Sequence, residues 1–453
     1  MEAINKKESI SRTFWRFTIP AIATMLVNGL YQIVDGVFVG HYMGQEGLAA
    51  INIAWPVISV LGGVGLMIGM GAGSLVSTFR GMRQSSKARQ AMGTGLLLIL
   101  LVGALCSAFL YAFGPALLAL QGADGVVGLY AVEYVAVFFW GACLTVGAGA
   151  IPFLVRNDDA PNMATGLMAL GAVTNIVLDY VFIGILGWGL EGAAVATVSA
   201  QAVVVVIGIA YFFTDYSALE MRLKDVTLDV VKMREILVLG SSCLVMYLYT
   251  GFMVAIHNRL FMDYGSATWV AAYAIVGYLM TLYYLLAQGI AEGMQPPVSY
   301  FFGENSAVKV GKTVWLACKV TTVLGLAWIV TLNLFPESLI GWFNSSNPEL
   351  TDAATLGIRL HLFNMFLDGL IVVSSVYFVS VGLGGVAFAI SLGNMVVQLP
   401  FLWFLPKWFG LEGVWLAMPL SNFFLAAVAL IAMYRHVKGG KVIPPLKSSM
   451  ISA

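Results

Sequence analysis

Long apolar stretches, separated by short polar segments, fill almost the whole chain. Each stretch holds about 20 or more mostly apolar residues, which is the length a helix needs to cross the hydrocarbon core of a bilayer. Polar and apolar residues do not alternate along them as in the strands of a membrane barrel, so the pattern predicts helices. In the first half of the chain the predicted crossings are 14–40, 48–78, 91–119, 126–152, 162–186 and 191–214. In the second half they are 236–262, 268–302, 313–335, 355–382, 386–406 and 411–437.

The composition requires a lipid environment. The 453 residues are 60% hydrophobic and only 10% charged, and the mean hydropathy is +0.90, which leaves too few polar side chains for a surface in water. We therefore predict an all-α membrane protein with twelve transmembrane helices in the lipid bilayer. The formal net charge is zero, so the chain offers no basic surface to nucleic acid, and we expect neither a cofactor nor an obligate protein partner.

The positions of Lys and Arg predict the orientation. An even number of crossings places both termini on one side, and cytoplasmic connections carry an excess of basic residues. The termini and the connections expected on their side carry Lys6, Lys7, Arg12, Arg16, Arg80, Arg83, Lys87, Arg89, Arg222, Lys224, Lys232, Arg234, Lys309, Lys312, Lys438, Lys441 and Lys447. The opposite connections carry little beyond Lys407. We therefore expect both termini in the cytoplasm.

A short internal match suggests a duplication. The segment 190–192 (Leu-Glu-Gly) recurs at 411–413, an offset of 221 residues, and the same offset relates Gly44 to Gly265. Each pair follows predicted helices of matching number and direction, so the halves would be parallel repeats. We predict an N-lobe over 1–214, a cytoplasmic linker over 215–235 and a C-lobe over 236–453, with a central cleft between the lobes.

Ionisable residues inside a predicted crossing are costly and are functional candidates by default. Asp35, Asp179 and Thr197 each lie five to seven residues from the outer end of their crossing, roughly 10 Å below the outer interface at 1.5 Å per residue. Asn175 precedes Asp179 by four residues, so both project from one helix face. These four side chains suit either a proton relay or a Na⁺ site, since hard cations prefer oxygen ligands. The alternative is that Asn175 and Asp179 only hydrogen-bond neighbouring helices.

Pro20, in the first half of the crossing 14–40, removes a backbone hydrogen bond and predicts a kink. Pro20 is either a hinge, at which the helix moves when the charge at Asp35 changes, or a static kink.

The second half carries different chemistry. Asp368 lies near the middle of the predicted crossing 355–382, and Glu292 lies about ten residues from the cytoplasmic end of 268–302. Each of these two carboxylates either pairs with a cationic substrate or forms an internal charge pair, such as Asp368 with Arg359 or His361.

Three segments of the first half have a characteristic sequence: IPAIATMLVNGLYQIVDGVFVGHYMGQEGLAA at 19–50, PFLVRNDDAPNMATGLMALGAVTNIVLDYVFI at 152–183 and GLEGAAVATVSAQ at 189–201. Through these segments the chain resembles the multidrug and toxic compound extrusion (MATE) family of transporters, and the resemblance covers essentially its whole length. The acidic residue, the Asn and Asp, and the Thr of the family's N-lobe cation site fall on Asp35, Asn175, Asp179 and Thr197. The family's proline, whose bending is implicated in drug release in some members, falls on Pro20.

The resemblance implies a bacterial inner-membrane antiporter that exchanges H⁺, or alternatively Na⁺, for amphipathic, often cationic drugs. The segment YQIVDGVFVGHYMG is nearer to the branch that relies on the N-lobe carboxylate (DinF-like). The predicted crossing 236–262 has no Glu, where another branch places the acidic residue of a C-lobe cation site.

Two other functions fit less well. A flippase of lipid-linked precursors uses the same paired lobes but is expected to show a strongly basic cleft, which the sequence lacks. An intramembrane enzyme is disfavoured because the motifs HExxH and GxSxG are absent.

Overall fold

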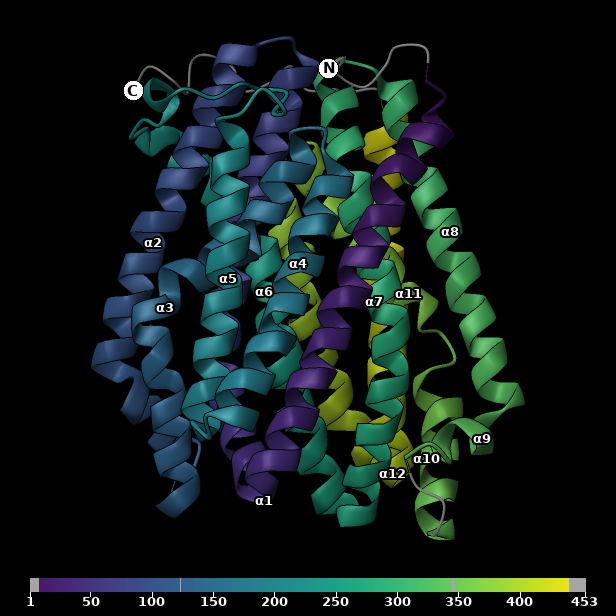
Figure 1. Ribbon diagram of the computed structural model, residues 1–453. Helices are drawn as coiled ribbons and strands as arrows, with labels where there is room; N and C mark the ends of the chain where they lie inside the picture. The colour runs from purple at the N-terminus through teal and green to yellow at the C-terminus, as the bar shows by residue number, and fades with distance from the viewer. Residues whose placement is uncertain (1–7, 123, 344–346, 440–453) are drawn as a thin grey trace.

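The computed structural model describes residues 8–122, 124–343 and 347–439, and within them the chain is a helical bundle without strands (Figure 1). The long helices of the first half are α1 (Ile10–Gly81), α2 (Ser85–Leu120), α3 (Gly125–Asn157), α4 (Pro161–Asp179) and α5 (Gly189–Phe212). Those of the second half are α6 (Val230–Tyr264), α7 (Ala267–Gly303), α8 (Ala307–Leu334), α10 (Pro348–His361), α11 (Phe366–Ser380) and α12 (Gly384–Lys438). Three short elements are the π-helix η1 (Tyr180–Ile185), the 3₁₀-helix η2 (Leu223–Asp225) and α9 (Pro336–Ile340).

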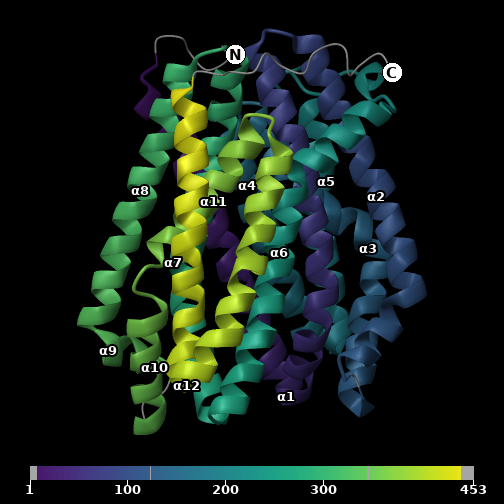
Figure 2. The ribbon, with the colours of Figure 1, turned by 180° about the vertical axis from the view of Figure 1, so that it is seen from behind.

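Two of the helices are hairpins that cross twice. Helix α1 has 72 residues, about 108 Å if it were straight at 1.5 Å per residue, far more than a bilayer core of about 30 Å. It reverses at Gly44, and α12 reverses at Gly410 (Figures 1 and 2). Among the described residues, nine helices and the bent pair α10–α11 have the length and composition of membrane spans. The two reversals add two crossings, so the chain makes the twelve that the sequence predicts.

The prediction of one helix over 355–382 is wrong in one respect, because this crossing is broken. Helices α10 and α11 are bent by 50° at residues 362–365. Two polar side chains at the break bond carbonyl groups of α12: His361 Nδ1 lies 2.8 Å from the oxygen of Trp415, and Asn364 Nδ2 donates to that of Pro419 at 2.7 Å. These two bonds hold the break against α12.

Other predicted boundaries also shift. Helix α3 continues to Asn157 rather than ending at 152, and α4 gives way to the π-helix η1 directly after Asp179. Helix α6 begins at Val230, so it takes up the last residues of the predicted linker and includes Glu235 near its start. Four basic residues of the predicted termini, Lys6, Lys7, Lys441 and Lys447, lie outside the described residues.

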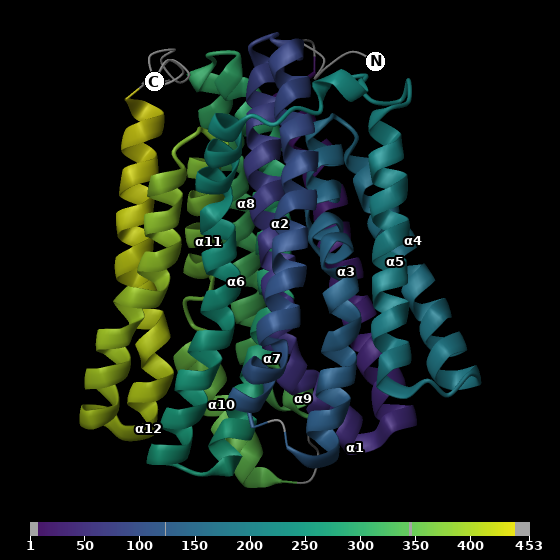
Figure 3. The same ribbon diagram turned by 90° about the vertical axis from the view of Figure 1, so that its left-hand side faces the viewer.

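The first- and second-half helices form two groups that lie side by side (Figures 1 and 3). Helix α1 begins, and α12 ends, at the same end of the bundle, which we call the terminal end (Figures 1 and 2). The turns at this end repeat their backbone conformation. Arg83 and Asn305 have φ values of 60° and 59°, and Asp159 and Gly382 have 72° and 79°. The offsets are 305 − 83 = 222 and 382 − 159 = 223, which is consistent with a duplicated chain.

Contacts between the two groups repeat in the same way. A Cβ on Gly81 would collide with the carbonyl oxygen of Tyr300, and a Cβ on Gly303 would collide with that of Thr78. Gly81 and Gly303 are 222 residues apart in the sequence, and so are Thr78 and Tyr300. The ends of α1 and α7 therefore cross in a reciprocal, two-fold manner at glycines, which lets the backbones approach closely.

The bundle is tightly closed at the terminal end. Every residue of α7 from Gly289 to Phe302 is buried, whereas from Ala267 to Gln288 only scattered positions are. Nearly all of α1 from Gly63 to Ser77, and all of α11 from Leu367 to Ser380, are buried as well. The two groups of helices thus enclose one another at the terminal end and are less tightly packed at the opposite end.

The two hairpin reversals predict a clear effect of substitution. Gly44 has φ 64° and ψ −152°, and Gly410 has φ 58° and ψ −131°, which residues with a Cβ rarely adopt. Replacing either glycine by alanine should lower the free energy of unfolding by about 1–3 kcal/mol, measured from thermal or denaturant unfolding in detergent.

The matched control is Gly62→Ala. All three glycines have open space where a Cβ would be placed, but Gly62 is helical, so alanine there should be neutral or stabilising by up to about 1 kcal/mol. Equal effects at the three positions would contradict the assignment of strain to the reversals.

Candidate functional site

Two carboxyl groups meet inside the first half. Asp35 lies on the first arm of α1, nine residues before the reversal at Gly44, and Asp179 is the last residue of α4. Their side chains interact directly. Asp179 is fully buried, and both of its oxygens and Oδ1 of Asp35 are buried without a hydrogen-bond partner. Two ionised carboxylates in contact repel, so a shared proton or a cation stabilises this arrangement.

The other two predicted residues lie beside this pair. Asn175 Nδ2 donates to Thr197 Oγ1 at 3.4 Å, which joins α4 to α5. Asn175 precedes Asp179 by one helical turn and is buried, with its Oδ1 unpartnered. The structure thus places all four predicted side chains in one region with several free oxygen atoms, the ligand type that hard cations prefer.

Two tyrosines next to the carboxyl pair were not among the site residues predicted from the sequence. Tyr31 and Tyr134 both lie close enough to Asp35 and Asp179 to interact with them electrostatically. Tyr31 precedes Asp35 by one turn of α1, a spacing that could have identified it, whereas Tyr134 comes from α3, and nothing in the sequence relates it to Asp35. Their hydroxyl groups add polar atoms around the site.

Pro20 of α1 is hydrogen-bonded to α4, the helix that carries Asn175 and Asp179. The backbone of α1 stays helical at Pro20, since its only non-helical residue is Gly44. The carbonyl oxygen of Pro20 accepts hydrogen bonds from Thr24 Oγ1 at 2.9 Å and from Thr165 Oγ1 of α4 at 2.7 Å. The two hydroxyls are 3.0 Å apart. A movement of α1 at Pro20 therefore acts directly on α4.

A second polar region joins the two halves at the terminal end. Four polar side chains of α7 follow one face of the helix at spacings of four, three and four residues: Gln288, Glu292, Gln295 and Ser299. Across the interface, Arg156 Nη1 lies 3.4 Å from Glu292 Oε2. Asn157 and Gln295 exchange two hydrogen bonds, of 2.9 Å and 3.2 Å. We call these four α7 residues, with Arg156 and Asn157, the inter-half polar layer.

Of this layer, sequence reasoning singled out only Glu292. The stripe on α7 is visible as a helical spacing in the sequence, but Arg156 and Asn157 fall beyond the predicted end of their helix at 152. The internal partner of Glu292 is thus an arginine from the other half of the chain.

Asp368 lies apart from this layer, in the first turn of α11 rather than in the middle of a continuous helix. Asn422 Nδ2 donates to its Oδ1 at 2.7 Å, and its Oδ2 is buried without a partner. Neither Arg359 nor His361 forms an ion pair with it among the described residues, so the structure does not show the internal charge pair that was one of the two alternatives for Asp368.

The family model named MatE matches the chain in two segments, residues 20–181 and 242–404. Together they span 162 + 163 = 325 of the 453 residues, and their starts differ by 242 − 20 = 222 residues, the offset seen in the structure. The chain belongs to the MatE family. It is therefore a member of a transporter family and not an enzyme.

Relatives of this MatE chain are similar over nearly their full length. The multidrug export protein MepA of Staphylococcus aureus (strain MRSA252) is 23% identical over 431 residues, which cover 95% of this chain and 94% of MepA. A MOP superfamily transporter from Pyrococcus furiosus has a TM-score of 0.90 at 23% identity and covers 97% of this chain and 100% of its own. The outward-facing conformation of a multidrug resistance MATE family transporter has the same TM-score and coverage at 24% identity. The solved structures show the shared fold.

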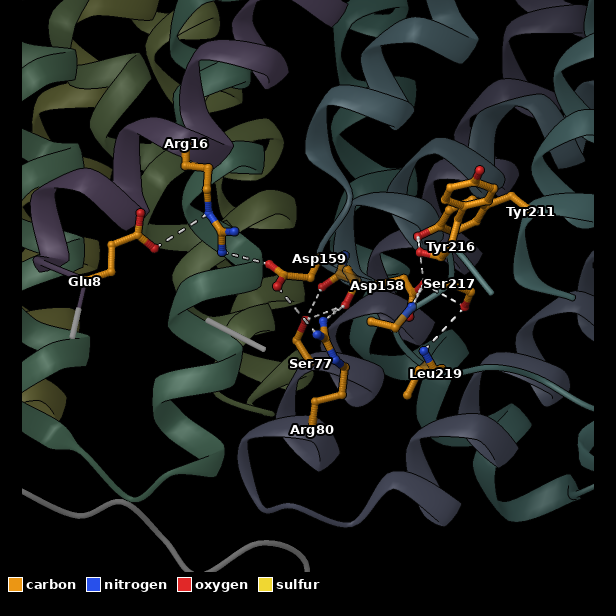
Figure 4. A network of polar contacts seen from close by, with 12 residues as sticks. Glu8, Arg16, Ser77, Arg80, Asp158, Asp159, Tyr211, Tyr216, Ser217 and Leu219 are labelled. Atoms are coloured by element: carbon orange, nitrogen blue, oxygen red, sulfur yellow. Dashed lines mark hydrogen bonds and ion pairs between the residues drawn. The ribbon is translucent and has the colours of Figure 1, made fainter. Parts of the chain in front are cut away.

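In this MatE chain the turn between α3 and α4 anchors both ends of α1 (Figure 4). Asp159 Oδ1 accepts from Arg16 Nη2 at 2.8 Å, and Asp159 Oδ2 lies 3.9 Å from Arg80 Nη2. Burial raises the pKa of the Asp159 carboxyl, and the guanidinium groups of Arg80 and Arg16 counteract that shift. Arg16 lies one turn before Pro20, so this ion pair fixes the segment of α1 that precedes the proline.

The neighbouring Asp158 holds the connection after α5. Its Oδ2 accepts from Tyr211 Oη at 2.9 Å, from Ser217 Oγ at 2.8 Å and from the amide of Ala218 at 2.9 Å (Figure 4). Burial raises the pKa of this carboxyl too, while Arg80 and these donors lower it. One turn thus fixes α1, α3, α4 and the start of the connection to the second half.

Asp159→Asn should loosen the start of α1. Asparagine tolerates the positive φ of this position but removes the ion pair with Arg16, a partly exposed contact worth about 1 kcal/mol or less. We expect faster tryptic cleavage at Arg12 and Arg16 and a small drop in the unfolding midpoint.

Asp124→Asn is the control, because Asp124 precedes α3 at the opposite end and makes no capping hydrogen bond. Cleavage at the same rate in Asp159→Asn and Asp124→Asn would show that Asp159 does not anchor α1.

Proposed function

We propose that this MatE chain is a secondary active exporter that exchanges H⁺, or alternatively Na⁺, for amphipathic, often cationic, organic compounds. The observation that carries this proposal is the contact between Asp35 and Asp179, with three carboxyl oxygens buried and unpartnered. The similarity of this chain to the multidrug export protein MepA supports drugs as the transported compounds. We also propose N- and C-lobes over 1–214 and 236–453, with the linker 215–235 between them.

The proposed orientation assigns the terminal end to the cytoplasm. Arg16, Arg80, Arg83 and Lys309 lie in or next to its turns, in keeping with the excess of basic residues on cytoplasmic sides of bacterial inner-membrane proteins. The tight packing of α1, α7 and α11 then closes the cytoplasmic side. In this proposed orientation, cations would reach Asp35 from outside.

Coupling follows from the position of the carboxyl pair. A cation that binds between Asp35 and Asp179 removes their repulsion and draws α1 toward α4, two helices that are already joined at Pro20 through Thr165. Movement of α1 at Pro20 would then change how α1 packs against α4. A cation can drive this change only if it binds the two states with different affinity.

The branch that relies on the N-lobe carboxylate accounts best for these side chains. Over the predicted crossing 236–262, helix α6 has no acidic residue, and Glu235 lies in its second turn at the terminal end. A C-lobe cation site on this helix would have no carboxylate at membrane depth. The proposed coupling group is therefore Asp35, with Asn175, Asp179 and Thr197 around it.

Proteoliposomes that contain ethidium at equal concentrations inside and outside test this function. Under an imposed pH gradient, or an imposed Na⁺ gradient, the unmodified chain should move ethidium against its concentration gradient. Asp35→Asn should reduce gradient-driven movement by roughly tenfold or more, because the cation no longer distinguishes the two states.

Glu133→Gln is the matched control, since Glu133 is an exposed acid on α3 and its loss should leave transport unchanged. The gradient that drives movement identifies the ion. No gradient-driven movement of any organic cation by the unmodified chain would exclude the exporter and favour a flippase of lipid-linked precursors.

A further inference from the structure

The ion pair of the inter-half polar layer joins two buried charges from different halves. Arg156 is at the end of α3 and Glu292 is within α7, and their side chains are 1% and 2% exposed. Arg156 is the one cation that forms an ion pair with Glu292 among the described residues. Both charges are thus removed from water, and each depends on the other for compensation.

The arginine is incompletely paired. Gln288 Nε2 donates to Glu292 Oε1 at 2.9 Å, but the contact between Arg156 Nη1 and Glu292 Oε2 is long, at 3.4 Å. Nε and Nη2 of Arg156 are buried without a hydrogen-bond partner. Unsatisfied donors of a buried charge are costly, so a pair selected only to stabilise the fold would be expected to fit better.

The repeat shows that the fold does not require this pair. Subtracting the α1-to-α7 offset of 222 from Glu292 gives Met70, and adding the α3-to-α11 offset of 223 to Arg156 gives Val379. Met70 and Val379 are both buried in one hydrophobic cluster. The equivalent place in the two-fold arrangement is therefore apolar, and apolar residues commonly replace buried ion pairs without loss of stability.

The surroundings of Glu292 suit an amphipathic cation. Tyr247 and Tyr284 lie close enough to interact electrostatically with its carboxylate, and the side chain of Tyr247 is 42% exposed. Phe153 presents its ring to the Arg156 guanidinium at 5.0 Å. Aromatic faces next to a carboxylate bind organic cations through both charge and ring contacts.

We propose that Glu292 binds the cationic group of the substrate and that Arg156 is a tethered cation that competes with the substrate for this carboxylate. This inference rests on the proposed function, because it requires the two lobes to separate on the cytoplasmic side during transport. Separation removes Arg156 and leaves Glu292 with an uncompensated charge, which a cationic substrate neutralises. When the lobes close again, Arg156 returns to Glu292 and displaces the substrate.

The two members of the pair should therefore have opposite effects on affinity. We would measure equilibrium binding of tritiated tetraphenylphosphonium, a permanent cation, to the purified full-length chain in nanodiscs. Arg156→Gln should bind it roughly fivefold or more tightly than the unmodified chain, and Glu292→Gln should bind it more weakly by a similar factor. Arg156→Lys keeps a competing cation and should stay near the unmodified affinity.

Binding of triphenylphosphine oxide, an uncharged analogue, separates competition from a general opening of the lobes. Its affinity should be unchanged in both single variants, whereas a shift in the population of states would change it along with that of the cation. The double variant R156M/E292M copies the apolar character of the equivalent place, so it should fold normally and lose its preference for the cation over the neutral compound.

Changes of the same sign in Arg156→Gln and Glu292→Gln would overturn the proposal, because a purely structural ion pair loses the same contact in either variant. Unfolding of R156M/E292M would overturn it as well. These results would leave gradient-driven transport by the unmodified chain intact, so they are distinguishable from failure of the exporter function, in which the unmodified chain transports no organic cation.

Discussion

Polar side chains inside this protein can be stabilised only by one another, because the surrounding hydrocarbon provides no hydrogen bonds. Some of them meet this constraint in pairs, such as Asn157 with Gln295. Several others meet it only in part, among them Asp368 Oδ2 and His257 Nε2, and two of these places take part in the proposed transport. There, Oδ1 of Asp35, both carboxyl oxygens of Asp179 and two nitrogens of Arg156 are buried without partners. We propose that at these two places the incomplete pairing marks groups whose partners change during function.

The two places differ in their relation to the duplication. Glycine contacts at the terminal end repeat between the halves, as do the left-handed residues of the turns, so the closed interface belongs to the common fold. The ion pair of Arg156 and Glu292 occurs once, where the equivalent residues are apolar. In the proposed mechanism, a two-fold framework opens and closes, while groups without an equivalent in the other half give the movement its direction and its preference for charge.

The sequence predicted those features that depend on local composition. The twelve crossings follow from apolar length, and the grouping of Asp35 with Asn175, Asp179 and Thr197 follows from depth and helical spacing. Features that depend on tertiary contacts were not predictable in this way. The break before Asp368 is held against α12 by bonds of His361 and Asn364, whose partners are distant in the sequence. Arg156 was missed because its helix extends five residues past the predicted end at 152, and because its partner Glu292 comes from α7 in the other half.

We propose that the candidate cation site of the first half controls whether the two halves meet at the terminal end. Spin labels on cysteines introduced at Gln84 and Val308, both exposed at that end, would report the separation by double electron–electron resonance in a chain whose four native cysteines are replaced by serine. We then expect the fraction of molecules with a short distance between the labels to change with proton or Na⁺ concentration, and to stay constant in Asp35→Asn. A distance distribution that responds to the cation equally with and without Asp35 would contradict it.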